Sequence, residues 1–352
     1  MTLEGWRTGM NSWQEILRKS ITTAEQLKAL YPTCDVGGVL GRYPMRINPY
    51  YLSLIEEPGD PIWKQAVPDL CELEDDDAPE DPLAEEKSSP VPNITHRYPD
   101  RVLFLISSQC AMYCRFCTRK RKVGTTLTIT DRTIAEGLDY IRAHREIRDV
   151  ILSGGDPLLL SDDRLEDIIS RVRSIPHVEI IRIGTRVPCV LPQRVTDELC
   201  TRLKRYHPLF LSVHFNHPRE LTPAAHEALG RLADAGIPLG NQTVLLKGVN
   251  DDGPTMKALF QGLLRCRVKP YYLYLADLSQ GTRHFRTTME KGLEIMHMIQ
   301  GHTSGLAVPH YVVDTVGGGG KVPLGGDNVV CSTEKEFTVV NYKNELYTVP
   351  QA

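Results

Sequence analysis

The sequence predicts an α/β fold in which parallel strands alternate with helices. From residue 101 onward, short apolar runs rich in β-branched residues alternate with amphipathic stretches of 11 to 14 residues. The apolar runs are nearly continuous, which is typical of parallel strands covered by helices. Six or seven such units favour a barrel, whole or partial, over an open sheet, although periodicity alone does not choose between the two.

Length and composition agree with a globular protein of this class. The chain has 352 residues, and at roughly 150 residues per domain this predicts about two domains, or one α/β barrel. The hydrophobic fraction of 41% and the charged fraction of 24% exclude wholesale disorder and fibrous folds. The net charge of −3 gives no support for a nucleic-acid or membrane partner. No apolar run reaches roughly 18 residues and the first residues form no apolar signal region, so we expect a cytoplasmic protein.

The residues before the repeating pattern divide into two regions. Residues 11–31 predict helix, with a start signal at Thr22-Thr23, and residues 1–71 are expected to form a mostly helical N-terminal region. Nine acidic residues crowd into positions 72–86. Such a block is usually solvated, so residues 72–95 are predicted to be an acidic linker.

Residues 96–322 carry the alternating pattern and are predicted to form the barrel core. The expected strands are 102–106, 150–152, 178–183, 209–215, 244–246, 271–275 and 311–313. The expected helices are 132–145, 163–175, 196–206, 223–235, 254–266 and 287–299. The pattern then changes to short strands with turns at 328–331, 337–342 and 345–349, so residues 323–352 are expected to form a short C-terminal β tail.

Polar or glycine residues stand near the ends of nearly all these strands. They occupy 107–110, 153–156, 184–186, 214–217, 241–243, 277–279 and 314–321. Because the carboxyl ends of parallel strands meet at one edge of an α/β fold, we expect one shared site there.

Three of the nine cysteines lie within eight residues, at Cys110, Cys114 and Cys117. Three thiolates from one loop can hold three irons of a cubane cluster and leave the fourth iron without a protein ligand. Structural zinc takes four ligands, usually in paired knuckles, and the chain has no second pair. A redox pair of Cys114 and Cys117 would leave Cys110 idle. The spacing therefore favours an iron–sulfur cluster, with zinc and unliganded thiols as alternatives.

The second unusual segment is the glycine run 317–320 followed by Lys321. A phosphate-binding Walker loop is excluded, because Thr315 and Val322 stand where that motif needs Gly and Ser or Thr. Four glycines let the backbone approach a bulky ligand, and an amine in a partly desolvated pocket can form a Schiff base with an aldehyde such as pyridoxal phosphate. The alternative is a flexible surface turn with a solvated lysine.

The C-x-x-x-C-x-x-C spacing directly after the first predicted core strand resembles the radical SAM superfamily, and Gly154-Gly155-Asp156 after the second strengthens the resemblance. The resemblance implies a partial (β/α)6-type radical SAM barrel. It also implies a 4Fe–4S cluster whose open iron binds S-adenosylmethionine, with the Gly154–Asp156 stretch against the methionine amino group.

A more specific resemblance covers residues 45–325. The chain is similar to the lysine 2,3-aminomutases, which also carry pyridoxal phosphate. The stretches that carry this resemblance, besides the glycine–lysine run, are 96–104, 117–119, 152–156, 214–218, 240–242, 270–272, 277–279 and 301–305.

The family resemblance implies a role for several residues toward the cofactors. Lys321 corresponds to the lysine that forms the imine with pyridoxal phosphate. Arg97 and Arg101 correspond to the pair at the cofactor phosphate, a suitable task for cationic forks, and Tyr98 is expected near the ring. Further cofactor or adenosyl-pocket positions fall at His214 and Gln242.

The same resemblance implies how the substrate is held. Arg119 corresponds to the arginine at the substrate α-carboxylate, and Asp277 and Asp314 correspond to the aspartates at the distal ammonium. Two crowded aspartates repel unless a cation lies between them, which agrees with this role. Taken singly, either aspartate is more often a helix cap or turn residue, and Arg119 lies in a basic run that would also suit a nucleic-acid patch.

The expected function is therefore L-lysine 2,3-aminomutase, which interconverts L-lysine and L-β-lysine by a radical 1,2-amino shift. A 2,3-aminomutase for arginine or another cationic amino acid is the alternative within the family, since a guanidinium also pairs with carboxylates. The two aspartates disfavour glutamate. A non-enzymatic iron–sulfur electron carrier is the alternative from another class. A one-electron reductant such as flavodoxin or ferredoxin is expected, as is a homo-oligomer, either dimer or tetramer. The tail holds only Cys331, so no zinc site is predicted there.

Overall fold

The computed structural model describes residues 12–75, 77–124, 129–325, 328–333, 335–341 and 343–350. Its main feature is a nine-stranded sheet in the order β1 to β9. Strands β2 to β8 are parallel, and helices connect them in six successive crossovers. The predicted partial (β/α)6-type barrel is confirmed. The strands are β1 (Ile94–Tyr98), β2 (Arg101–Ser107), β3 (Asp149–Gly154), β4 (Ile180–Thr185), β5 (Leu209–Val213), β6 (Leu239–Leu245), β7 (Val268–Leu275), β8 (His310–Thr315) and β9 (Gly320–Pro323).

Two edge strands that the sequence did not predict flank the parallel strands. Strand β1 is antiparallel to β2, and β9 is antiparallel to β8. The backbone N–H of Lys321 on β9 donates a hydrogen bond of 2.9 Å to the hydroxyl of Tyr98 on β1. This bond joins the two edges of the sheet, so the barrel is nearly closed at the point where Lys321 lies.

The side chains of the strands alternate between two environments. On β3, Val150 and Leu152 are buried in the main hydrophobic cluster together with helix residues such as Leu138. The alternate residues Ile151 and Ser153 line a central cavity. Since successive side chains of a strand point to opposite faces, one face of the sheet packs on the helices and the other surrounds the cavity.

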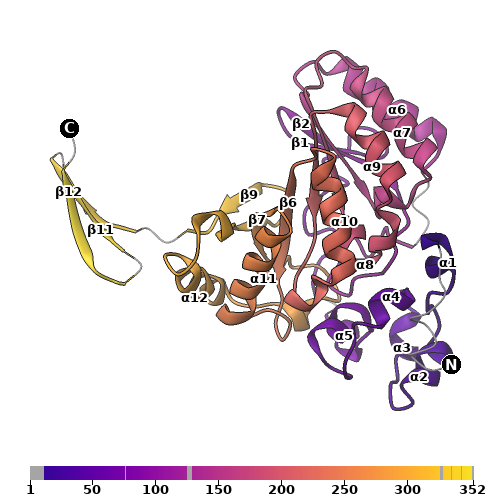
Figure 1. The fold of residues 1–352 in the computed structure, drawn as a ribbon, viewed down its shortest axis with the longest axis horizontal. Coiled ribbons are helices and arrows are strands. Elements are labelled where there is room, and N and C mark those ends of the chain that lie inside the picture. The colour runs from indigo at the N-terminus through magenta and orange to yellow at the C-terminus, as the bar shows by residue number, and fades with distance from the viewer. Residues whose placement is uncertain are drawn as a thin grey trace.

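Helices cover the outer face of the sheet (Figure 1). They are α6 (Asp131–Ala143), α7 (Asp162–Arg173), α8 (Val187–Val190), α9 (Asp197–Leu203), α10 (Pro223–Asp234), α11 (Gly253–Arg265) and α12 (Met289–Ile299). Most begin at a side-chain cap; the hydroxyls of Thr130 and Ser161, for example, accept backbone N–H groups of the first turns of α6 and α7. The six predicted core helices are confirmed to within a few residues. The strand predicted at 244–246 belongs to β6, which begins at Leu239. Asn241–Thr243 therefore lie within this strand and not at its end.

Short 3₁₀ helices complete the connections. They are η2 (Leu70–Leu73), η3 (Pro157–Leu159), η4 (Pro192–Arg194), η5 (Lys204–Tyr206), η6 (Pro218–Glu220), η7 (Arg283–Phe285) and η8 (Gly305–Ala307). No helix in the described ranges is long and apolar enough to span a membrane.

The N-terminal region is helical but more divided than the sequence predicts. Residues 11–31 are not one helix: α1 (Trp13–Arg18) and α2 (Ala24–Leu30) are separated by a segment in which Ile21 pairs with Ile47, and residue 11 lies outside the described residues. Thr23 begins α2 with a capping box, as its start signal predicts. The helices α3 (Gly37–Leu40), α4 (Pro49–Leu52) and α5 (Pro61–Ala66) follow and lie at one end of the barrel in Figure 1.

The prediction that the acidic segment is solvated is wrong for three of its residues, Glu72, Asp75 and Glu85, which are buried, whereas Glu74, Asp77, Glu80 and Glu86 are exposed. Glu72 is fully buried and Glu85 is 4% exposed. Glu72 pairs with Arg115 at 2.6 Å and with Lys120 at 2.7 Å, and Glu85 pairs with Arg119 at 2.5 Å. The basic residues within and after the cysteine motif neutralise Glu72 and Glu85, so these charges can be buried as pairs. Asp76 lies outside the described residues.

The C-terminal tail forms a separate three-stranded antiparallel sheet, as predicted. Its strands are β10 (Val329–Ser332), β11 (Glu336–Val340) and β12 (Leu346–Pro350). Figure 1 shows this sheet projecting away from the barrel. Apolar side chains on it are exposed, namely Val329, Val330, Leu346, Tyr347 and Val349.

Candidate active site

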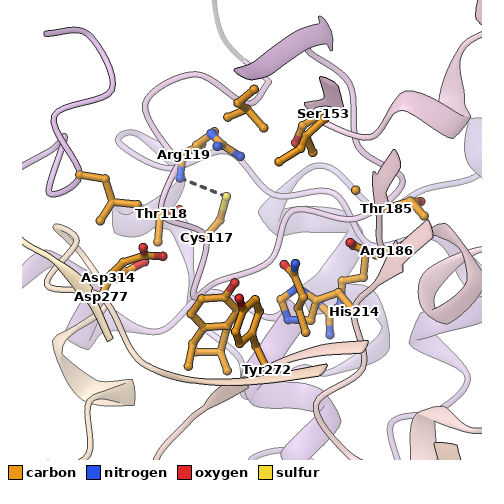
Figure 2. A pocket seen from close by; sticks show the side chains of 18 of the residues that line it. Cys117, Thr118, Arg119, Ser153, Thr185, Arg186, His214, Tyr272, Asp277 and Asp314 are labelled. Carbon is orange, nitrogen blue, oxygen red and sulfur yellow. Dashed lines mark hydrogen bonds between the residues drawn. The ribbon is translucent and has the colours of Figure 1, made fainter. Parts of the chain in front are cut away.

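A cavity of about 720 Å³ lies inside the barrel, and all fifteen predicted site residues line it. The structure therefore brings together residues that are up to 224 positions apart in the chain, from Arg97 to Lys321. Figure 2 shows the cysteine loop, the aspartates and the end of β4 around this space.

The cysteine loop follows β2, and its backbone forms hydrogen bonds with residues of the N-terminal region. The guanidinium of Arg46 donates to the Cys110 carbonyl at 3.2 Å, and the amide of Asn48 donates to the Ala111 carbonyl at 3.1 Å. In return, the Tyr113 N–H donates to the Arg46 carbonyl at 3.0 Å. The N-terminal helices therefore fix the shape of the loop that carries the thiols.

The three thiols suit a cluster better than a single ion. Burial raises the pKa of Cys110 and Cys117, and the neighbouring cysteines add to this effect. A bound cation would offset that cost, because metal coordination favours the thiolate. Three soft thiolates from one loop fit a 4Fe–4S cluster, whereas a structural zinc ion takes four protein ligands.

The two glycines after β3 are required by backbone packing. A Cβ on Gly154 would lie 2.0 Å from the Ser107 carbonyl oxygen, and one on Gly155 would lie 2.3 Å from that of Gln109. The N–H groups of Gly155 and Asp156 donate to these same two carbonyls, each at 2.6 Å. This stretch therefore packs directly against the backbone that leads into the cysteine loop.

The carboxylate of Asp156 is already occupied by protein donors. It accepts the Thr185 hydroxyl at 2.7 Å and the backbone N–H of Arg186 at 2.7 Å, as well as those of Leu158 and Val187. Burial raises its pKa to about 6 in spite of these hydrogen bonds. Its side chain thus ties the end of β3 to the end of β4.

Lys321 is the second residue of β9, directly after the turn that joins β8 to β9. Gly317, Gly318 and Gly320 have positive φ angles, which allow this tight turn at little steric cost. The Lys321 Nζ lies 3.0 Å from a carboxylate oxygen of Asp314 and 5.3 Å from the centre of the Tyr274 ring. The lysine is therefore at the cavity wall, not on a solvated surface turn.

Asp277 faces the same end of the cavity. Its Oδ1 is buried and makes no hydrogen bond to any residue that the structure describes. Burial raises the pKa of Asp277 to about 7, and the negative charge of Asp314 adds to the effect. The ionised carboxylate is therefore not fully compensated by neighbouring positive charges. A cationic ligand between the two aspartates would supply the missing charge.

Arg97, Tyr98 and Arg101 lie together at the edge of the sheet. The Arg101 guanidinium lies 3.9 Å from the centre of the Tyr98 ring, and the Tyr98 hydroxyl bonds Lys321 as described above. The Nε of Arg97 is buried and has no hydrogen-bond partner within the described part of the chain. An unsatisfied guanidinium donor beside a lysine amine and an aromatic ring fits the phosphate and ring of pyridoxal phosphate.

Arg119 is held by a residue that the sequence analysis missed. Its Nε and Nη2 donate to the carboxylate of Glu85 at 2.9 Å and 2.5 Å, and Figure 2 shows its backbone N–H directed at Cys117 Sγ, 3.4 Å away. Burial would raise the pKa of Glu85, but Arg119 and the neighbouring cations overcome this and lower it to about 2. The sequence does not indicate this pairing, because residues 72–86 contain nine acidic residues and only the tertiary fold brings Glu85 to Arg119.

Arg186 is the second residue that the sequence analysis missed as a site residue, although it follows a predicted strand. Its Nη1 lies 2.8 Å from Cys114 Sγ. His214 lies nearby (Figure 2), and burial together with the charge of Arg186 lowers its pKa to about 3, so its ring is neutral at pH 7. Gln242 lies on β6 and also lines the cavity.

Comparisons with known proteins agree with this geometry. Residues 104–258 match the radical SAM superfamily, and residues 296–351 match a family described as lysine-2,3-aminomutase. The chain is 49% identical to L-lysine 2,3-aminomutase of Fusobacterium nucleatum, covering 100% of this chain and 84% of that protein. It is 50% identical to the enzyme of the same name from Acetoanaerobium sticklandii, covering 96% and 84%. It is also 45% identical to glutamate 2,3-aminomutase of Clostridioides difficile, covering 92% and 78%.

Sequence identities of this size over most of both chains establish the family to which the site belongs. The chain is a member of the lysine 2,3-aminomutase family within the radical SAM superfamily.

Proposed function

We propose that this chain is an L-lysine 2,3-aminomutase that interconverts L-lysine and L-β-lysine. The observation that carries the substrate assignment is the position of Asp277 and Asp314 at the end of the cavity that holds Lys321. A buried pair of carboxylates favours a cationic distal group and disfavours the carboxylate of glutamate, even though one relative is a glutamate 2,3-aminomutase. The electron-carrier alternative leaves these aspartates and Lys321 without a task.

The residues divide into three groups by what they hold. Cys110, Cys114 and Cys117 would hold the cluster, and the ends of β3, β5 and β6 would surround S-adenosylmethionine. Lys321 would bind pyridoxal phosphate covalently, with Arg97 and Arg101 at its phosphate. When bound, these cofactors supply the radical that takes hydrogen from substrate C3 and the conjugated system through which the amino nitrogen moves from C2 to C3.

The contribution of the protein is to orient the substrate. Arg119 has Nη1 available for the substrate α-carboxylate, because Glu85 engages its Nε and Nη2. Asp277 and Asp314 would pair with the distal ammonium at the opposite end. Binding at both charged ends fixes C2 and C3 relative to the cofactors, and the barrel wall keeps water away from the reacting carbons.

The assay for this function is anaerobic. The protein is reconstituted with iron and sulfide and then supplied with pyridoxal phosphate, S-adenosylmethionine, dithionite and one amino acid. Chromatography with mass detection should find β-lysine from L-lysine, with L-arginine and L-glutamate converted much more slowly. Asp314→Asn should reduce lysine conversion by 10²-fold or more, whereas Asp139→Asn, an exposed carboxylate on α6, should leave it unchanged. Equal conversion of glutamate would contradict the substrate assignment.

The remaining features of this proposal concern partners and compartment. A low-potential one-electron protein such as flavodoxin or ferredoxin would reduce the cluster. We place the enzyme in the cytoplasm, in keeping with nine cysteines that form no disulfide. The exposed apolar side chains of β10–β12 support a homo-oligomer, dimer or tetramer, that buries this tail. Light scattering of the wild type and of Leu346→Glu tests this, since the variant should dissociate.

A further inference from the structure

Arg186 is an arginine at the cavity wall whose surroundings hold it against one cysteine. It follows β4 and is 8% exposed. Its Nη1 donates to Cys114 Sγ at 2.8 Å, and the guanidinium carbon lies 5.0 Å from the centre of the Phe116 ring. The contact is therefore between a buried cation and the sulfur of an expected cluster ligand.

The other terminal nitrogen of the guanidinium, Nη2, donates hydrogen bonds to two buried acceptors. It donates to Gln65 Oε1 at 2.6 Å and to Glu220 Oε1 at 2.8 Å. Both acceptors are fully buried. Gln65 belongs to α5 of the N-terminal region, and Glu220 closes η6, so elements from two parts of the chain hold the arginine in place.

Glu220 is itself fully engaged. It accepts the Tyr51 hydroxyl at 2.7 Å and the backbone N–H groups of Asn216 and His217 at 2.6 Å and 3.0 Å. These hydrogen bonds fix the carboxylate, and the carboxylate fixes Arg186. These contacts hold the Arg186 guanidinium beside Cys114 Sγ.

We propose that Arg186 is a positioning residue that sets the reduction potential of the cluster through its hydrogen bond to the Cys114 sulfur. This rests on the proposed function only in requiring the cluster. Hydrogen bonds to cluster sulfurs and nearby net charge are the main protein controls of iron–sulfur potentials. The cluster accepts one electron from the external donor and becomes more negative by one charge, so a fixed positive charge favours the reduced form. Glu220 is a buried negative charge that pairs with Arg186, so it opposes the stabilisation of the reduced cluster by Arg186.

The test is a potentiometric titration of the fully reconstituted wild type and variants, with the reduced cluster followed by electron paramagnetic resonance. Arg186→Met should lower the midpoint potential, so that the ratio of reduced to oxidised cluster at a fixed potential falls about tenfold, equivalent to about 59 mV for one electron. Glu220→Gln should shift the potential in the opposite direction. Arg194→Met removes an equally buried arginine that contacts no sulfur, and should leave the potential unchanged.

Opposite shifts in the two variants support the proposal, and a merely structural role would not produce them. Unchanged potentials, or shifts of the same sign, in variants with full iron content overturn it. If Arg186→Met does not retain iron, Arg186→Lys takes its place: it keeps the charge but cannot reach Cys114, Gln65 and Glu220 together, so its potential should fall by a smaller amount. These measurements do not depend on β-lysine formation, so failure of the substrate assignment is recognised separately.

Discussion

Asp277 offers a test in which one substitution should increase stability while it removes a charge that we propose binds the substrate. Its side chain is largely buried, with Oδ1 unpartnered, and burial together with Asp314 raises its pKa from 3.8 to about 7. A carboxyl with a raised pKa binds its proton more tightly in the folded than in the unfolded protein. Ionised Asp277 therefore destabilises the fold, and Asp277→Asn removes that cost.

The size of the effect follows from the two pKa values. The difference between 3.8 and about 7, at about 1.4 kcal/mol for each tenfold change in proton affinity, gives up to about 4 kcal/mol above pH 7. The cost is absent below about pH 4 and develops between the two values, so roughly 2 kcal/mol of it is present at about pH 5.5. The stabilisation by Asp277→Asn should therefore increase with pH and level off above about pH 7.

Urea unfolding of the ligand-free protein, followed by circular dichroism at about pH 5.5 and pH 8, measures this. Asp314→Asn is the matched control in the same pocket. Asp314 accepts the Lys321 ammonium at 3.0 Å, so its replacement leaves a lysine without its ion pair and should not stabilise the fold. The reasoning is refuted if Asp277→Asn gives no gain at pH 8, or the same gain at both pH values.

Three other predictions concern the same cavity and its supports. Gly154→Ala should abolish cluster binding, measured as iron content, because its Cβ would lie 2.0 Å from the Ser107 carbonyl oxygen; retained iron would show that the backbone can move. Glu72→Ala should lower the free energy of unfolding by about 3–5 kcal/mol in denaturant titrations, since it leaves Arg115 buried and unpaired, whereas a change below about 1 kcal/mol would show that water reaches the pair. The affinity for L-lysine, measured by calorimetry on the pyridoxal phosphate-loaded protein, should fall as pH drops below about 7, because protonation of Asp277 removes a charge that pairs with the ammonium; a flat profile from pH 6 to 8 would contradict this.

The elements of the barrel were predictable because their signals are local. The amphipathic period placed α6, α7, α10, α11 and α12 within a few residues, since a helix that covers a sheet must repeat its apolar face every turn. The cysteine spacing and the glycine–lysine run likewise need no partner from elsewhere in the chain to be recognised. Strands β1 and β9 were not predicted because they are short edge strands. Their pairing depends on the neighbouring strands and not on an apolar pattern in their own sequence.

The sequence by itself determined the fold class, the position of the cysteine loop after the first core strand and the set of residues at one end of the strands. Only the tertiary structure decided which charges meet. Glu72 pairs with Arg115 across 43 positions, Glu85 with Arg119 across 34, and Arg186 contacts Cys114 across 72. A residue's type shows that it carries charge, but whether the charge is solvated or buried depends on the segment that packs over it. For this reason an acidic run that composition assigns to solvent supplies two of the buried ion pairs around the site.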